Sequence, residues 1–205
     1  MLAWTVAAVL AGPAAAQSPF GPRASTGTPG AESTGFDTIH TRFGFELRTR
    51  WGQQVQGRFP SHDGALVRLP DGRNQVHIRL RTGDVEVEGS ERYTAIARGE
   101  RFFDAARHPL IEFVSEPHLP ALAHDGGKLR GRLTMHGVSR IETFTVAPAT
   151  CDRPGVDCDV VAHGSVDRRD YGLDGWRWAL TDTVRFNMRV RLQERPEQRL
   201  QARPR

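Results

Sequence analysis

Apolar and polar residues alternate along most of the chain from Thr38 onward. In residues 184–192 every second residue is apolar, and the residues between them are arginine or asparagine. A closely similar alternation runs through residues 39–47, 75–81 and 128–136. A period of two over five or more residues indicates a strand with one buried and one solvent-exposed face, which is typical of antiparallel sheets. We therefore expect antiparallel strands in these four places.

Five shorter runs extend this β pattern, and turn signals separate several of them. The turns are Pro-Asp-Gly at 70–72, Asp-Gly-Gly at 125–127 and His-Gly at 136–137. Only residues 90–99 have a helical pattern, with Ser90 in the N-cap position and Gly99 just past the end. The five additional candidate strands are residues 55–59, 64–69, 111–115, 142–146 and 160–166.

Eight or nine strands and one short helix place the chain in the all-β class. Two architectures fit these elements, an eight-stranded antiparallel closed barrel and a two-sheet sandwich. Closure leaves no exposed strand edge, and eight strands enclose just enough room for packed side chains or one small apolar ligand. We predict the closed barrel.

The two ends of the chain differ from this alternating body. Residues 1–16 have the form of a secretory signal peptide, with an apolar run followed by Ala-Ala-Ala before Gln17. No basic residue precedes the apolar run, which leaves a buried N-terminal helix as the alternative. Residues 17–35, rich in Gly, Pro, Ser and Thr, are expected to be a flexible linker, and residues 193–205 a disordered basic tail. We expect one domain over residues 36–192, exported to the periplasm.

Arginine supplies nearly all of the positive charge. Lys128 is the only lysine among 28 basic residues, which outnumber the 24 acidic residues and give a net charge of +4. A basic chain can bind nucleic acid or an anionic membrane surface. We expect no nucleic-acid partner, because the strand arginines fall on the rows opposite the apolar ones; a basic binding module with a packed core is the alternative. These outward positions are Arg79, Arg81, Arg130, Arg132, Arg185, Arg189 and Arg191.

Cys151 and Cys158 bracket a short loop between two predicted strands. In an exported protein two such cysteines are expected to form a disulfide. A zinc site would need two more ligands, and only His163 is close in the sequence. The Cys-x-x-Cys spacing of a redox-active pair is absent. We predict the disulfide and no metal site.

Several short motifs follow one another along the predicted domain. The most specific is Arg-Phe-Phe-Asp at 101–104, which is followed by His108-Pro109 and by Ile-Glu-Phe at 111–113. The others are Asp-Thr-Ile-His-Thr at 37–41, Gly-Arg-Leu-Thr-Met-His-Gly-Val at 131–138 and Asp-Arg-Arg-Asp-Tyr-Gly-Leu at 167–173.

In their order and spacing these motifs resemble those of the YceI-like proteins, and the resemblance covers residues 37–192. It implies a secreted bacterial barrel of lipocalin-like shape that binds a polyisoprenoid lipid. The chain departs from the family pattern at Arg169, where Ser or Thr is usual, and at Glu142, where an apolar residue is usual.

The inward apolar rows are the expected ligand site of such a barrel. An apolar chain binds there because burying its surface is worth roughly 25 cal/mol per Å². The alternative is that the same side chains fill the barrel as a packed core. No cofactor is required beyond a bound isoprenoid lipid or quinone. The predicted lining residues are Phe43, Phe45, Val55, Val76, Ile78, Leu80, Ile111, Phe113, Leu129, Leu133, Phe144, Phe186 and Met188.

Glu142 and Arg168 are the polar candidates for contact with a ligand's head group. Glu142 has the same strand parity as Phe144, so its carboxylate either faces the interior or lies at the wet rim. Arg168 either contacts a phosphate or quinone head group or holds its own loop through an ion pair or backbone hydrogen bonds, and we favour the second. Trp176 and Trp178 follow in a loop, where they touch a membrane interface or anchor the loop.

Catalysis is not predicted. The chain has no Gly-x-Ser-x-Gly nucleophile motif, no phosphate-binding glycine loop and no His-Glu-x-x-His. An enzyme that uses Glu142 or His40 for acid–base work would need a second titratable group within hydrogen-bond reach. The expected function is that of an exported carrier or sequestering protein for an isoprenoid lipid, with transient membrane-surface contact and a homodimer left open.

Overall fold

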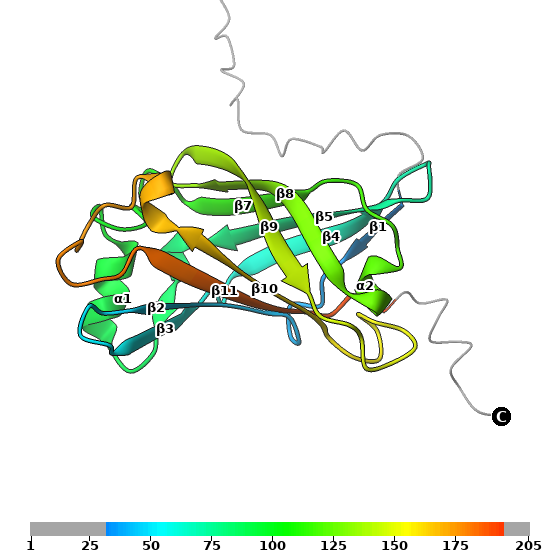
Figure 1. Cartoon of the computed structure of the whole chain (residues 1–205), viewed down its shortest axis with the longest axis horizontal. Coiled ribbons are helices and arrows are strands. Elements are labelled where there is room, and N and C mark those ends of the chain that lie inside the picture. Colours follow the sequence, from blue (N-terminus) through cyan, green and yellow to red (C-terminus); the bar gives the residue numbers. More distant parts are fainter. Residues whose placement is uncertain (1–31, 195–205) are drawn as a thin grey trace, which may run out of the picture.

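One curled antiparallel sheet forms the body of the computed structural model, which describes residues 32–194 (Figure 1). The strand order is β1-β4-β5-β7-β8-β9-β10-β11-β2-β3-β6, and every pairing is antiparallel. The strands are β1 (Glu32–Gly35), β2 (Arg42–Arg48), β3 (Gln54–Arg58), β4 (His62–Arg68), β5 (Asn74–Arg81), β6 (Glu86–Val87), β7 (Leu110–Ser115), β8 (Gly127–Met135), β9 (Val138–Val146), β10 (Val160–Asp167) and β11 (Thr183–Val190).

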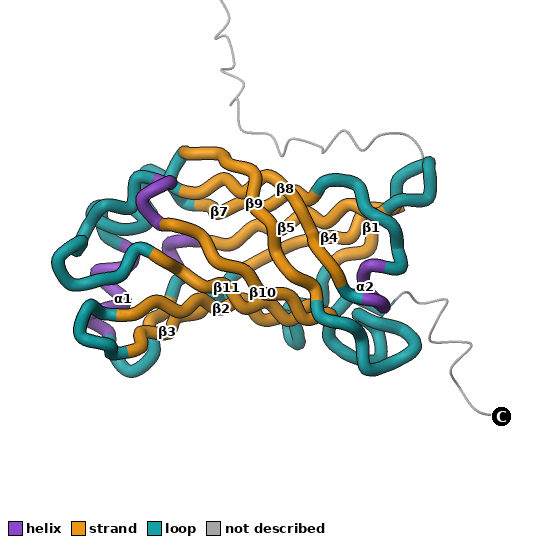
Figure 2. Tube along the Cα trace, in the orientation of Figure 1, coloured by secondary structure: helices purple, strands orange, loops and turns teal. Residues whose placement is uncertain are grey.

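Four short helical segments lie at the ends of the sheet, as Figure 2 shows in purple. The α-helices are α1 (Glu91–Arg98) and α2 (Leu122–Asp125), which occupy opposite ends of the molecule (Figure 1). Two 3₁₀ turns are η1 (Thr82–Asp84) and η2 (Arg168–Tyr171). Ser90 caps α1 as predicted, since its hydroxyl accepts a hydrogen bond from the Tyr93 N–H at 3.1 Å. Within residues 32–194 no helix is long and apolar enough to cross a bilayer.

The all-β prediction is confirmed, but the predicted strand and helix counts are wrong. The sheet has eleven strands rather than eight, and α2 adds a second α-helix. All nine runs identified from the sequence form strands, and the two extra strands are β1 and β6. The linear order starts at β1 and ends at β6, while β3 leads directly into β4 through residues 59–61. Because β3 pairs with β2 and β4 pairs with β5, this bend carries the sheet around the core.

The predicted linker ends earlier than expected. Its last residues, Glu32–Gly35, form β1 because their backbone pairs with β4, from Glu32 opposite Arg68 to Gly35 opposite Ala65. The N–H of Gln193, a residue expected in the disordered tail, donates to the Gly35 carbonyl at 2.9 Å. The predicted signal peptide, the rest of the predicted linker and residues 195–205 of the predicted tail lie outside the described residues.

Acidic side chains lie beside the outward-facing arginines of the strands. Arg79 on β5 pairs with Asp63 at 2.7 Å, and Arg130 on β8 pairs with Glu116 at 3.3 Å. These acidic partners neutralise part of the positive charge of the strand arginines through local ion pairs.

Glycines in the strands leave room for phenylalanine rings in the core. A methyl group on Gly131 would lie 2.5 Å from the Val114 carbonyl oxygen and 2.6 Å from the Phe113 ring. Both distances are shorter than van der Waals contact, so no larger residue fits without moving backbone or ring. The same close approach of a ring over a glycine occurs in the pairs Phe45–Gly57, Phe36–Gly64 and Phe144–Gly164.

Replacing Gly131 by alanine is therefore expected to lower the free energy of unfolding by about 1–3 kcal/mol, the usual cost of overpacking a core. Gly44→Ala is the matched control, because a methyl group there first meets a backbone oxygen at 3.4 Å, an ordinary contact. Urea unfolding followed by fluorescence measures both variants. Equal losses of stability in the two variants would contradict this explanation of the strand glycines.

Candidate functional site

A mainly apolar cavity with a volume of about 320 Å³ lies at the α1 end of the sheet. The β2–β3 hairpin, α1 and the loop of residues 176–180 surround it. Its lining is mainly apolar and aromatic, as in cavities that bind small organic ligands. The lining residues are Phe45, Leu47, Thr49, Trp51, Gln53, Val55, Val87, Arg92, Tyr93, Ile96, Ala97, Phe102, Trp176, Trp178, Ala179 and Leu180. We refer to this space as the first cavity.

Exposed aromatic side chains surround the mouth of the first cavity. Trp51, Tyr93 and Trp178 are 61%, 51% and 69% exposed, although each also lines the cavity. The ring centroids of Trp51 and Trp178 are 6.1 Å apart, and those of Trp176 and Trp178 are 5.8 Å apart. We call Trp51, Tyr93, Trp176 and Trp178 the aromatic rim. Large apolar side chains left in water at the mouth of an apolar cavity indicate a contact surface.

Two smaller cavities lie further along the interior. The second, of about 100 Å³, is lined mainly by apolar residues of β4, β5, α2, β10 and β11. The third, of about 30 Å³, lies among Phe43, Phe113, Phe144 and Phe186 and is no larger than the share of one water molecule in the liquid. The Phe113 and Phe144 rings meet edge to face, with centroids 5.1 Å apart. These phenylalanines form a packed waist.

All thirteen predicted lining residues border one of the three cavities. Phe45 and Val55 border the first cavity. Val76 and Leu129 border the second, and Ile78, Phe113 and Met188 border both the second and the third. The remaining six surround only the third cavity, where they pack as core: Phe43, Leu80, Ile111, Leu133, Phe144 and Phe186.

Sequence reasoning missed most of the first cavity. Ile96 and Ala97 lie on α1, and Phe102 lies in the segment that follows it, so no strand alternation marks them. From the sequence, Trp176 and Trp178 are expected to touch a membrane interface or to anchor their loop, not to line a cavity. The tryptophans at 51, 176 and 178 are far from α1 in the sequence, so only the folded structure brings them to the helix.

Glu142 is held by a protein partner. Its carboxylate accepts a hydrogen bond from the hydroxyl of Tyr171 at 2.7 Å, and Tyr171 is fully buried. Burial, together with the hydrogen bond to this carboxylate, raises the pKa of Tyr171, so the phenol remains a proton donor at neutral pH. Glu142 borders none of the three cavities, and its position therefore does not support head-group contact.

Arg168 is a structural clamp rather than a ligand contact. Its side chain is fully buried and donates hydrogen bonds to the carbonyls of Leu173 at 2.5 Å, Gly175 at 2.6 Å and Thr181 at 3.1 Å. The nearest carboxylate is that of Asp182, at 3.8 Å. These contacts support the structural alternative, and Arg168 borders none of the three cavities. Through these bonds Arg168 holds the loop that carries Trp176 and Trp178 of the aromatic rim.

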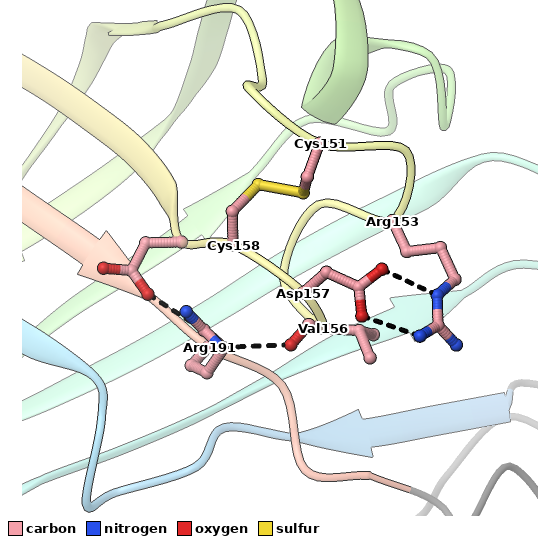
Figure 3. Close-up of a disulfide and its surroundings, with 7 residues drawn as sticks. Cys151, Arg153, Val156, Asp157, Cys158 and Arg191 are labelled. Atoms are coloured by element: carbon pink, nitrogen blue, oxygen red, sulfur yellow. Dashed lines mark hydrogen bonds and ion pairs between the residues drawn. A yellow bond between two sulfur atoms is a disulfide. The ribbon is translucent and has the colours of Figure 1, made fainter. Parts of the chain in front are cut away.

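The predicted disulfide between Cys151 and Cys158 is present (Figure 3). Beside it, Arg191 donates to the Asp159 carboxylate at 2.9 Å and to the Val156 carbonyl at 3.0 Å. These contacts fix the loop to the residue that follows β11. Pro154 of the same loop borders the second cavity, so the disulfide loop covers that end of the interior.

His40, considered above as an acid–base residue, has a titratable partner but does not border a cavity. His40 Nδ1 lies 2.6 Å from the Asp37 carboxylate, in an exposed turn. The hydrogen bonds from this histidine and from the Ile39 N–H lower the pKa of Asp37. Neither His40 nor Asp37 borders any of the three cavities. The pair stabilises the turn before β2.

Solved structures with similar folds come from three bacteria. BcnA of Burkholderia cenocepacia superposes with a TM-score of 0.63 at 16% identity, covering 76% of this chain and 98% of that one. A polyisoprenoid-binding domain of Saccharophagus degradans implicated in plant cell wall breakdown gives 0.57 at 13% identity, covering 77% and 95%. The Campylobacter jejuni YceI protein gives 0.50 at 16% identity, covering 68% and 85%. No curated protein sequence matches the chain.

The curled antiparallel sheet thus agrees with these structures in fold. In sequence, residues 35–192 match the model of the YceI-like domain, which includes every strand from β2 to β11. The protein is a member of the YceI-like domain family.

Proposed function

We propose that the protein binds the hydrocarbon chain of an isoprenoid lipid, such as a polyprenyl lipid or a quinone, through the first cavity. The observation that carries this proposal is an apolar space of about 320 Å³ bordered by four exposed or half-buried aromatic side chains. The binding activity stated for the Saccharophagus degradans domain supports the same class of ligand.

The energetics favour an apolar chain without directed polar contacts. Burying each 100 Å² of apolar ligand surface is worth about 2.5 kcal/mol. The first cavity offers few polar side chains, of which Arg92 and Gln53 lie at its border. Since neither Glu142 nor Arg168 reaches a cavity, the head group stays at the aromatic rim, in contact with water.

A long chain must pass the packed waist. The phenylalanine rings there separate the first cavity from the second, and the third cavity between them is too small for a chain. We propose that these rings rotate when a long isoprenoid enters, joining the cavities into one channel. In that state the curled sheet encloses the hydrocarbon chain along its length.

The aromatic rim provides the route of entry. Tryptophan and tyrosine favour the interface between membrane and water, where an apolar ring and a polar N–H or O–H are both satisfied. We propose that the exported protein touches a membrane transiently with this rim and takes up or releases lipid there as a carrier. The disulfide accords with an oxidising compartment such as the periplasm.

Mass spectrometry of organic extracts from protein purified from its native source tests the proposal. The expected result is an isoprenoid lipid in stoichiometric amount, released only on denaturation. Extracts that contain no lipid, or only membrane phospholipid in the proportions of the host, would count against it. Retention on heparin that disappears with salt, together with an empty extract, would instead favour the basic binding module.

A further inference from the structure

Three side chains that could bind a metal ion lie close together, away from the cavities proposed to bind the lipid. Asp104, His108 and His136 each offer one ligand atom, and these atoms all lie within 4.8 Å of one another. They come from the segment after α1, the segment before β7 and the turn between β8 and β9. None of the three borders a cavity described above. All three lie in the short motifs at residues 101–104, 108–109 and 131–138.

His136 is oriented by a hydrogen bond on its far side. Its Nδ1 lies 3.2 Å from the carbonyl oxygen of Tyr171. A carbonyl only accepts hydrogen bonds, so Nδ1 carries the proton and Nε2 keeps a free lone pair. This arrangement, in which one ring nitrogen donates to a backbone carbonyl, is usual for histidines that bind a metal through the other nitrogen.

His108 lies directly beside His136. The two ring centroids are 4.5 Å apart, and the His108 ring is half-buried. Its backbone is fixed, because its N–H donates to the Asp104 carbonyl at 2.8 Å and its carbonyl accepts from the Thr82 hydroxyl at 2.7 Å. In the part of the chain that the structure describes, neither ring nitrogen of His108 has a hydrogen-bond partner.

Asp104 supplies a buried carboxylate to the same point. Its side chain is 6% exposed, and one oxygen accepts from Arg107 Nε at 2.5 Å. Within residues 32–194 the other oxygen has no hydrogen-bond partner. Arg107 also lies 3.3 Å from Glu100, which offsets part of its positive charge. Ligating carboxylates commonly keep such a second hydrogen bond.

The backbone holds two of these residues in an uncommon conformation. Asp104 and His136 have φ values of 46° and 51°, in the left-handed region that favours glycine. Among the non-glycine residues of the described chain, only Trp176 shares this feature. Such conformations persist where the surrounding structure fixes them, and they concentrate at functional sites.

We propose that Asp104, His108 and His136 bind one divalent transition-metal ion of the zinc class. Two imidazole nitrogens and a carboxylate oxygen suit Zn²⁺, Co²⁺ or Ni²⁺ and not Ca²⁺ or Mg²⁺, which prefer all-oxygen sites. Ligand bonds of about 2.0–2.1 Å require only small rotations of side chains that already approach this closely. Three protein ligands leave a fourth position for water, as in zinc sites that remain open to ligands.

Isothermal titration of the chelator-treated full chain with Zn²⁺ alone tests the site. The expected result is one equivalent of Zn²⁺ per chain. Asp104→Asn and His136→Asn are expected to weaken binding by at least about tenfold. Asparagine is chosen because it tolerates the left-handed backbone better than other non-glycine residues. His124→Asn, at an exposed histidine paired with Asp125, is the matched control and should bind Zn²⁺ like the wild type.

Cobalt provides a second readout that does not depend on the variants folding. Co²⁺ bound to wild-type protein should show visible absorption bands of a four-coordinate nitrogen and oxygen site, which Zn²⁺ then abolishes by displacement. Failure of the wild type to take up Zn²⁺ would overturn the proposal. It would also be overturned if His124→Asn lost binding while folded His136→Asn retained it, because a surface histidine would then be the ligand.

Discussion

Replacing Arg168 by methionine is expected to lower the free energy of unfolding by about 3–5 kcal/mol, the range found when one partner of a buried charged network is removed. The fully buried guanidinium donates to three loop carbonyls. Methionine has similar length but no donor, so these carbonyls lose their partners, and the Asp182 carboxylate, 3.8 Å away, loses its nearest buried cation. Chemical denaturation of the full chain measures the loss.

The neighbouring arginine provides the control. Arg169 pairs with Asp167 at 2.7 Å, but its side chain is 47% exposed, and exposed ion pairs contribute little. Arg169→Met should therefore change stability far less than Arg168→Met. A small loss for Arg168→Met, or equal losses for the two variants, would show that Arg168 does not clamp the loop. Lipid uptake by Arg168→Met should also fall, because Trp176 and Trp178 of the rim lie on the loop that Arg168 holds.

The second large effect is expected from a variant that fills the first cavity. Val55 is half-buried on β3 and borders that cavity. Val55→Trp would place an indole in the space proposed for the ligand, and strands accept tryptophan well. Affinity for a short prenyl alcohol should fall by at least about tenfold, which corresponds to about 1.4 kcal/mol. Titration calorimetry measures the affinity without interference from the added fluorophore.

Gln56, the outward-facing neighbour of Val55, provides a matched control for Val55→Trp. Gln56 is exposed on the same strand, so Gln56→Trp adds the same aromatic group outside the cavity. This variant should bind the prenyl alcohol as the wild type does. If Val55→Trp retained full affinity while remaining folded, the ligand would have to bind elsewhere, and the first cavity would not be the site.

Strand positions could be predicted from the sequence because the interior of this sheet is apolar and its exterior is rich in arginine. The register of β11 illustrates this, with Val184 and Phe186 buried and Arg185 and Asn187 exposed. Two strands, β1 and β6, were not predicted from the sequence, and each has a physical reason. β1 is a polar Glu-Ser-Thr-Gly segment that is a strand only because β4 offers it a partner, and β6 has just two residues. Tertiary pairing, rather than local pattern, creates both.

The candidate site was predictable only in part. Alternation identified inward residues, but it could not distinguish those that border an open space from those that pack as the waist, since both are apolar. Phe45 and Phe144 look alike in sequence, yet one faces the first cavity and the other fills the waist. Glu142 was correctly placed on the parity of Phe144, but its partner Tyr171 is distant in the sequence.

The cluster of Asp104, His108 and His136 could not be predicted from the sequence, because its members meet only in the folded structure. His136 is 28 residues beyond His108, and no regular metal-ligand spacing joins them. Only the β8–β9 turn brings His136 to the segment before β7. The expectation of no metal site rests on the lack of further ligands near the two cysteines, which form the disulfide, and on the absence of a His-Glu-x-x-His motif.

The most direct test of the central claim is a crystal structure of the protein purified from its native source. Lipid binding in the first cavity predicts elongated density that begins beneath the aromatic rim at Trp178 and runs inward along Phe45 and Leu47. For a long chain, the density should continue past a rotated Phe113 or Phe144 into the second cavity. An interior that contains only side chains, with the first cavity collapsed onto Ile96 and Phe102, would contradict the proposed lipid-binding function.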